Sequence, residues 1–119
     1  MDSLLYDFFK LAANKDRFRI MFLLFQSDLC VCQLTKILNL TQPTVSKNLS
    51  KLRDTRFVYT KRVGKFTYYI FKTDNICVKD FFNNLVQHLN DYPDLMIDQK
   101  GLIKKEKHLT CCDQKIKAE

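Results

Sequence analysis

Residues 40–53 read Leu40-Thr41-Gln42-Pro43-Thr44-Val45-Ser46-Lys47-Asn48-Leu49-Ser50-Lys51-Leu52-Arg53. Thr41 is a favourable helix N-cap, and Pro43 stands in the first turn, where a missing amide hydrogen costs nothing. Val45, Leu49 and Leu52 then line one face. The opposite face has small or hydrogen-bonding side chains and no carboxylate: Gln42, Thr44, Ser46, Lys47, Ser50 and Lys51. The stretch predicts an amphipathic helix with a polar face that suits base edges and phosphates.

The residues on both sides of this helix complete a known arrangement. Upstream, apolar positions from about Val31 to Leu38 predict a short helix that ends near Asn39, a residue that tolerates the left-handed conformation. Two short helices joined by a tight turn form a helix-turn-helix. Downstream, the β-branched and aromatic residues 57–71 are interrupted only by Arg62-Val63-Gly64-Lys65, which predicts a hairpin with a cationic tip. With two further helices at about 4–12 and 18–25, the sequence predicts a mainly α fold with a β-hairpin wing, a winged helix-turn-helix.

A last helix is indicated by apolar residues at helical spacing between Phe81 and Leu89. Its apolar stripe and that of the first helix exceed what so small a core needs, which predicts a dimer formed by the terminal helices. The alternative is that both stripes cover the core of a single chain. We assign residues 1–91 to a winged helix-turn-helix DNA-binding and dimerisation domain and residues 92–119 to a polar C-terminal tail.

The net charge of +7 is unevenly distributed along the 119 residues. Residues 36–72 contain nine Lys or Arg and a single acid, Asp54, so this segment carries +8, whereas the rest of the chain sums to −1. Such a cationic segment is typical of a surface that meets nucleic acid phosphates, although a solvated basic face is the plainer interpretation of charge alone. No export signal or membrane span is evident, which predicts a cytoplasmic protein.

Five cysteines stand at positions 30, 32, 77, 111 and 112. In a reducing compartment we expect them to be thiols or plain buried residues, and we expect no disulfide framework. The pair Cys30 and Cys32 directly precedes the predicted helix-turn-helix, and soft thiolates favour soft, thiophilic ions. This pair is therefore the first candidate for an ion-binding site.

Three motifs in order, Asp28-Leu29-Cys30-Val31-Cys32-Gln33-Leu34, Leu40 to Arg53 and Arg62 to Tyr69, resemble the ArsR/SmtB family of metal-sensing winged-helix repressors, and within it the arsenic-responsive branch. The resemblance covers about residues 3–91. It implies a homodimeric transcriptional repressor that binds double-stranded operator DNA and dissociates when As(III) or Sb(III) loads the Cys-Val-Cys site. It further implies control of an arsenical-resistance operon.

On a regular helix, the side chains of Cys30 and Cys32 would point about 200° apart. Loading both sulfurs onto one ion would then require the start of the helix to distort, which couples ion binding to DNA binding. The arsenic motif commonly has a third cysteine where this chain has Thr35. A third ligand would come from Cys77, Cys111, Cys112 or an external thiol.

Zinc-responsive relatives carry ligands on the last helix in a pattern whose spacing this chain shares at Cys77, His88 and Asp91. A Zn(II) or Cd(II) site across the dimer is thus the alternative inducer site. The plainer interpretation is that His88 and Asp91 are surface residues and Cys77 is buried.

For DNA, the residue types divide into two groups. Gln, Ser, Thr and Lys on the polar helix face can contact base edges, whereas the outer lysines and arginines are suited to phosphates, which position without specifying. The groove set is Gln42, Thr44, Ser46 and Lys47, and the phosphate set is Lys51, Lys61, Arg62 and Lys65. The family often has His where this chain has Asn48, which bears on the operator sequence.

Two other classes of protein fit less well. An enzyme is disfavoured because the chain has no C-x-x-C redox pair and its histidines, His88 and His108, have no evident nucleophile partner in sequence. A cytosolic metal buffer would leave the +8 segment and the helix-turn-helix without a purpose. We therefore expect a regulator, with no catalytic residues.

Overall fold

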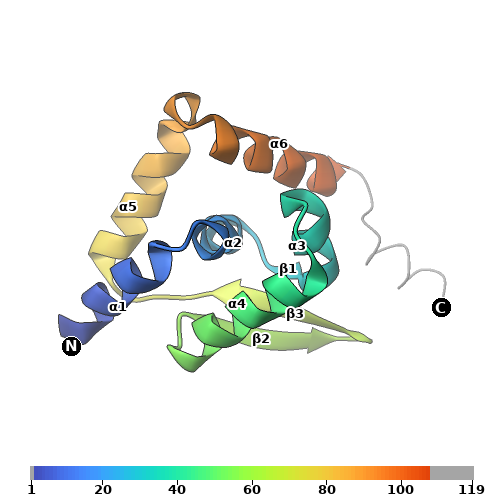
Figure 1. Ribbon diagram of the computed structural model, residues 1–119, viewed down its shortest axis with the longest axis horizontal. Helices are drawn as coiled ribbons and strands as arrows, with labels where there is room; N and C mark the ends of the chain where they lie inside the picture. The colour runs from blue at the N-terminus through green and yellow to red at the C-terminus, as the bar shows by residue number, and fades with distance from the viewer. Residues whose placement is uncertain (1, 108–119) are drawn as a thin grey trace.

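The computed structural model describes residues 2–107, which form six helices, one 3₁₀ turn and three strands within that range (Figure 1). The helix-turn-helix consists of α3 and α4, and the hairpin that follows is the wing. The elements are α1 (Asp2–Ala12), α2 (Lys15–Gln26), β1 (Leu29–Cys30), α3 (Val31–Leu38), α4 (Gln42–Asp54), β2 (Val58–Val63), β3 (Phe66–Phe71), α5 (Ile76–Gln87), η1 (Leu89–Asp91) and α6 (Pro93–Lys107). The mainly α winged-helix prediction is confirmed.

Local signals place the ends of α3 and α4 and the turn of the wing. Helix α3 ends with Asn39 in the left-handed conformation, φ 56° and ψ 43°. Helix α4 begins after Thr41, whose side chain accepts a hydrogen bond from the Thr44 amide, with a proline in the first turn. The hairpin turn has Gly64 at φ +60°, a conformation that glycine adopts without steric cost.

The sheet has the order β1-β3-β2, and all its pairs are antiparallel. Strand β1 was not predicted. It places Leu29 opposite Tyr69 and Cys30 opposite Tyr68, so the residue just before α3 is paired to the inner strand of the wing. A two-residue strand has no periodicity of its own, and its existence depends on a partner nearly 40 residues away in the sequence.

The core is built around α2, which lies inside the frame formed by α5, α6, α3 and the sheet in Figure 1. Its middle residues, Ile20 to Leu24, are all buried. An aromatic cluster fills the side toward α1, α5 and the sheet: the Phe82 ring lies with its centroid 5.0 Å from Phe25 and 5.6 Å from Phe8. Such offset and edge-on ring pairs add to the burial of apolar area.

The expectation that residues 92–119 form a loose polar tail is wrong for residues 93–107. They form α6, which crosses from the end of α5 to α3 (Figure 1) and packs on α2 and α3, burying Leu95 and Leu102. Periodicity did not reveal this helix because its apolar residues do not gather on one face: Leu95 and Leu102 are buried, whereas Ile97 and Ile103 are exposed. Residues 108–119, including His108, Cys111 and Cys112, lie outside the described residues.

Helix α4 ends in a left-handed residue that is not glycine. Arg56 has φ +67°, its amide donates to the Arg53 carbonyl, and the Phe57 amide donates to the Leu52 carbonyl, which is the Schellman pattern. A side chain with a Cβ costs about 1–2 kcal/mol in this region. We therefore expect Arg56→Gly to raise the free energy of unfolding by about 0.5–1 kcal/mol, measured in urea.

The matched control is Arg53→Gly, which removes the same side chain from the last turn of α4. Because position 53 is helical, that change should instead lower the free energy of unfolding by about 1 kcal/mol. Equal effects of the two substitutions would contradict the assignment of strain to position 56.

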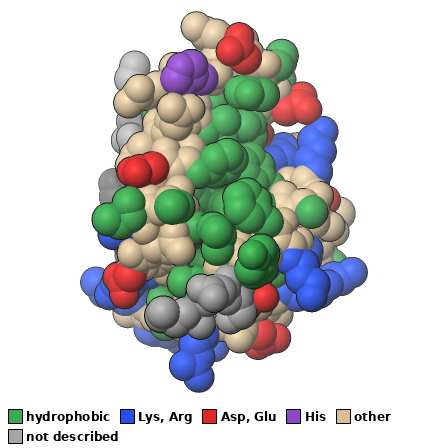
Figure 2. All heavy atoms as spheres, turned by 90° about the vertical axis from the view of Figure 1, so that its left-hand side faces the viewer, with side chains coloured by type: hydrophobic (Ala, Val, Ile, Leu, Met, Phe, Trp, Pro, Cys, Tyr) green, Lys and Arg blue, Asp and Glu red, His purple; other side chains and the backbone are tan. Residues whose placement is uncertain are grey.

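One face of the molecule is apolar and open. Figure 2 shows a continuous hydrophobic band on the side of the molecule where α1 and α5 lie in Figure 1. The exposed apolar side chains of these two helices include Tyr6, 71% exposed, and Phe9, 55% exposed, on α1, and Phe81 and Ile76 on α5. The opposite faces of these helices, which include Phe8 and Phe82, are already buried in the core of the single chain.

Candidate functional site

Helix α4 presents a polar face to solvent. Its buried side consists of Val45, Leu49 and Leu52, which fix its rotation against the core. Of the groove candidates, Gln42, Ser46 and Lys47 are exposed, as is the phosphate candidate Lys51. Thr44 is half-buried, and its hydroxyl receives a 2.9 Å hydrogen bond from the Thr41 hydroxyl, so it is engaged in the helix cap.

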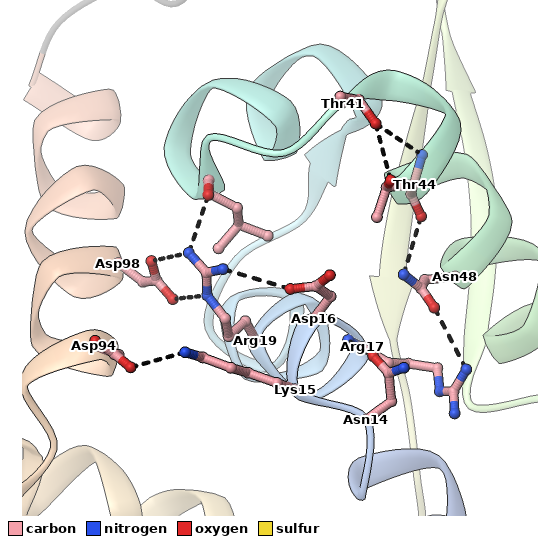
Figure 3. A network of polar contacts seen from close by, with 11 residues as sticks. Asn14, Lys15, Asp16, Arg17, Arg19, Thr41, Thr44, Asn48, Asp94 and Asp98 are labelled. Carbon is pink, nitrogen blue, oxygen red and sulfur yellow. Dashed lines mark hydrogen bonds and ion pairs between the residues drawn. The ribbon is translucent and has the colours of Figure 1, made fainter.

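Asn48 faces inward rather than toward a groove. Only 6% of it is exposed, its amide nitrogen donates to the Thr44 carbonyl at 3.0 Å, and its amide oxygen accepts a 3.4 Å hydrogen bond from Arg17 (Figure 3). Arg17 also donates to the Leu11 carbonyl at the end of α1. Asn48 therefore anchors α4 to α2, and the inference that this position bears directly on the operator sequence is corrected.

The wing carries its cations at and beside the turn. Lys61, Arg62 and Lys65 are all exposed, and the Arg62 Nε donates to the Gly64 carbonyl at 3.4 Å, across the turn. In the register of the hairpin, Lys61 lies opposite Tyr68 and Arg62 opposite Thr67. The β-ladder thus holds the three charges together at the end of the hairpin.

The two cysteines before the helix-turn-helix do not sit on one regular helix. Cys30 is 3% exposed, belongs to β1 and forms the N-cap of α3 in extended conformation, whereas the half-buried Cys32 lies in the first turn. The expectation that both sulfurs diverge by 200° on a helix, which would then have to unwind, is wrong because the helix begins at Val31. Both cysteines are disulfide-bonded in this structure, which differs from the expected free thiols.

A surface depression of about 400 Å³ lies between the cysteines, the start of α4 and the turn of the wing. Thr35 of α3 and the aromatic residues Phe66 and Tyr69 of β3 contribute to its walls. The full lining is Cys30, Val31, Cys32, Thr35, Gln42, Lys65, Phe66, Thr67 and Tyr69. The structure thus brings a predicted ligand pair, a predicted groove residue and a predicted phosphate residue to one place. The β3 residues of the lining were missed because the pairing of β1 with β3 was not foreseen.

The alternative ligand set is not gathered within one copy of the chain. His88 and Asp91 line a common depression at the end of α5, and the His88 Nδ1 lies 2.8 Å from the Asn84 carbonyl oxygen. Cys77 is exposed in the first turn of α5, about 16 Å away along the helix axis. Among residues 2–107, no cluster of three or more His, Cys, Asp or Glu side chains could hold a metal ion.

Comparison with known proteins agrees with this geometry. Residues 14–60, which span α2, the helix-turn-helix and the start of the wing, match the family described as bacterial regulatory protein, arsR family. The chain belongs to the ArsR/SmtB family. It is 32% identical over 85 residues to a transcriptional repressor SmtB homolog of Synechocystis, covering 71% of this chain and 63% of that protein.

Two further comparisons, one of sequence and one of structure, concern relatives of this ArsR/SmtB-family protein. It is 39% identical over 62 residues to the arsenic resistance transcriptional regulator ArsR1 of Pseudomonas putida, covering 51% of this chain and 48% of that protein. The homodimeric winged helix-turn-helix DNA-binding domain of Mb0332 from Mycobacterium bovis superposes with a TM-score of 0.58 at 28% identity, covering 75% of this chain and 80% of that one. The chain spans about half to two thirds of the length of these curated relatives.

The family assignment agrees with the regulator class that the sequence favoured over an enzyme or a metal buffer. Family members and the matched relatives are DNA-binding transcriptional regulators. None of the helices between residues 2 and 107 is long and apolar enough to cross a membrane.

Proposed function

We propose that this protein is a homodimeric transcriptional repressor that leaves its operator when As(III) or Sb(III) binds to the thiolates of Cys30 and Cys32. The observation that carries the proposal is the shared depression, in which the cysteine pair lies beside Gln42 of α4 and Lys65 of the wing turn. An ion held there is next to both elements that would contact DNA.

The donor chemistry fits a thiophilic ion. Two soft sulfurs and no carboxylate line the depression, a set that disfavours hard cations. Because thiolates are the ligands, the disulfide-bonded state has to be reduced before an ion binds. Within the described residues the third ligand has no candidate cysteine nearby, since Cys77 is on α5, which leaves an external thiol or the cysteines at 111 and 112.

The route from ion to DNA runs through the backbone of Cys30. This residue is paired with Tyr68 on β3, while Cys32 is in the first turn of α3. An ion that draws the two sulfurs together pulls the wing strand and the helix-turn-helix toward one another. Binding of the ion and of DNA then compete as a coupling free energy of about 1–3 kcal/mol, which acts equally in both directions.

The test is a titration of the reduced protein on a fluorescently labelled promoter fragment of an arsenic-resistance operon, followed by anisotropy. As(III), Sb(III), Cd(II) and Zn(II) are added separately. Release by As(III) or Sb(III) alone supports the proposal. Binding that none of the four ions reverses would refute the inducer assignment, and absence of binding would refute the repressor assignment.

A second candidate has one observation in its favour. His88 and Asp91 share a depression at the end of α5, on the side of the molecule that bears the apolar band, so a second copy could bring its Cys77 to them. We therefore retain a Zn(II)- or Cd(II)-responsive repressor as the alternative. Release by Zn(II) or Cd(II), lost on His88→Ala, would establish it in place of the As(III) site.

The apolar band is proposed as the dimer surface. Introducing a charge there, as in Phe9→Asp, should give a folded monomer. In a dimer, the new carboxylate of each copy would be buried in the interface without a partner, which disfavours association. Sedimentation velocity measures the change, and Ile97→Asp, at a similarly exposed apolar position on α6, should remain dimeric. A dimeric Phe9→Asp protein would show that the interface lies elsewhere.

A further inference from the structure

A single arginine joins three helices on the side of the helix-turn-helix opposite the wing. Arg19 of α2 holds both carboxylate oxygens of Asp98 on α6, with Nε at 2.9 Å and Nη2 at 3.0 Å (Figure 3). The same Nη2 donates to the Leu38 carbonyl at 3.0 Å. Asp98 is only 1% exposed, so the pair is largely shielded from solvent.

The Leu38 carbonyl belongs to the last turn of α3, where backbone acceptors lack helical partners. A cation at this end satisfies such an acceptor and interacts favourably with the helix dipole. Hydrogen bonding to Asp98 raises the pKa of Arg19 above its ordinary value, which favours the charged guanidinium. Arg19 therefore fixes the end of α3 relative to α2 and α6.

A close apolar contact supports the same placement. Gly101 of α6 lies against Ile37 so tightly that a Cβ at position 101 would stand 3.0 Å from the Ile37 Cγ2. Leu102 is buried beside it. In contrast, the neighbouring ion pair between Lys15 and Asp94 has side chains 71% and 67% exposed, and such pairs contribute little.

We propose that Arg19 and Asp98 are positioning residues for DNA recognition, and that α6 braces α3 so that α4 enters the groove at the correct angle. Only three residues, 39–41, separate the braced end of α3 from the first turn of α4. A shift of α3 is therefore passed directly to Gln42. The inference rests on the proposed DNA-binding function and adds α6 to the elements that determine operator affinity.

The test compares the full-length protein with Arg19→Lys, which keeps the charge but cannot span both Asp98 oxygens and the Leu38 carbonyl. Affinity is measured for the promoter fragment and for a scrambled fragment of the same length, well below the melting temperature of each variant. We expect about 10-fold weaker binding to the promoter fragment and unchanged binding to the scrambled one. As(III) binding should be unchanged, and Asp94→Asn on the same helix is the matched control with no effect.

A second variant avoids any change in charge. Gly101→Ala forces α6 away from Ile37 and should weaken promoter binding in the same selective way, whereas Ile37→Ala together with Gly101→Ala should restore binding to the level of Ile37→Ala alone. If Arg19→Lys does not fold, Gly101→Ala tests by itself whether α6 positions α3 for DNA binding. Folded variants that bind the promoter like the wild type, or that lose both fragments equally, overturn the inference. A wild type with no preference for the promoter refutes the proposed function and the inference with it.

Discussion

Cys30→Ser and Cys32→Ser are each expected to bind the promoter fragment as tightly as the wild type and to remain bound when As(III) is added. Serine keeps the size of the side chain but has no soft donor, so neither variant can offer two thiolates to one ion. The wild type should lose about 5- to 150-fold in DNA affinity on As(III) binding, and both variants should lose none of it. Anisotropy titrations of the reduced proteins measure this difference.

Cys77→Ser is the matched control, because it removes an exposed thiol from α5, remote from the depression. It should release DNA as the wild type does. Normal release by both single variants at 30 and 32 would show that the inducer binds elsewhere. Loss of release in Cys77→Ser alone would favour the site on α5.

Neutralising the wing should weaken DNA binding by at least about 100-fold at 0.15 M salt, because the three phosphate contacts proposed for each wing of the dimer no longer release counterions. The variant combines Lys61→Gln, Arg62→Gln and Lys65→Gln. Because both wings of the proposed dimer carry the change, six contacts are lost, and the slope of log affinity against log salt should become shallower by about 5. Affinity measured between 0.05 and 0.3 M salt checks both numbers.

The control for the wing carries the same change in net charge elsewhere. Lys79, Lys100 and Lys104 are exposed on α5 and α6, and their replacement by Gln should alter affinity far less. As(III) binding should survive in both triple variants. A wing variant with wild-type affinity and slope would show that the hairpin does not contact DNA, and would favour the alternative of a metal buffer.

The winged-helix order could be predicted because each of its elements carries its own local signal. Thr41 caps α4, Asn39 closes α3 in the left-handed conformation and Gly64 turns the hairpin, and all three choices depend on neighbours within a few residues. The face of α4 that meets the core was likewise evident from Val45, Leu49 and Leu52. Such features need no knowledge of distant contacts.

What could not be predicted depends on pairs far apart in the chain. Helix α6 docks through a buried ion pair and a glycine contact, and a search for apolar periodicity detects neither. The extended conformation of Cys30 depends on Tyr68, and the inward orientation of Asn48 depends on Arg17. A polar residue on a helix shows whether it faces solvent or a partner only when the partner is in place.

The orientation of α6 relative to α5 is determined at η1, the short turn between them. Helix α5 contributes to the apolar band proposed for the dimer, and α6 then spans 15 residues, about 22 Å, to reach the back of α3. A tilt of about 5° at the short η1 joint would carry the far end of such a rod by about 2 Å. In the proposed dimer, the angle of this three-residue joint would therefore contribute to the distance between the two α4 helices, which would have to match the spacing of half-sites on DNA.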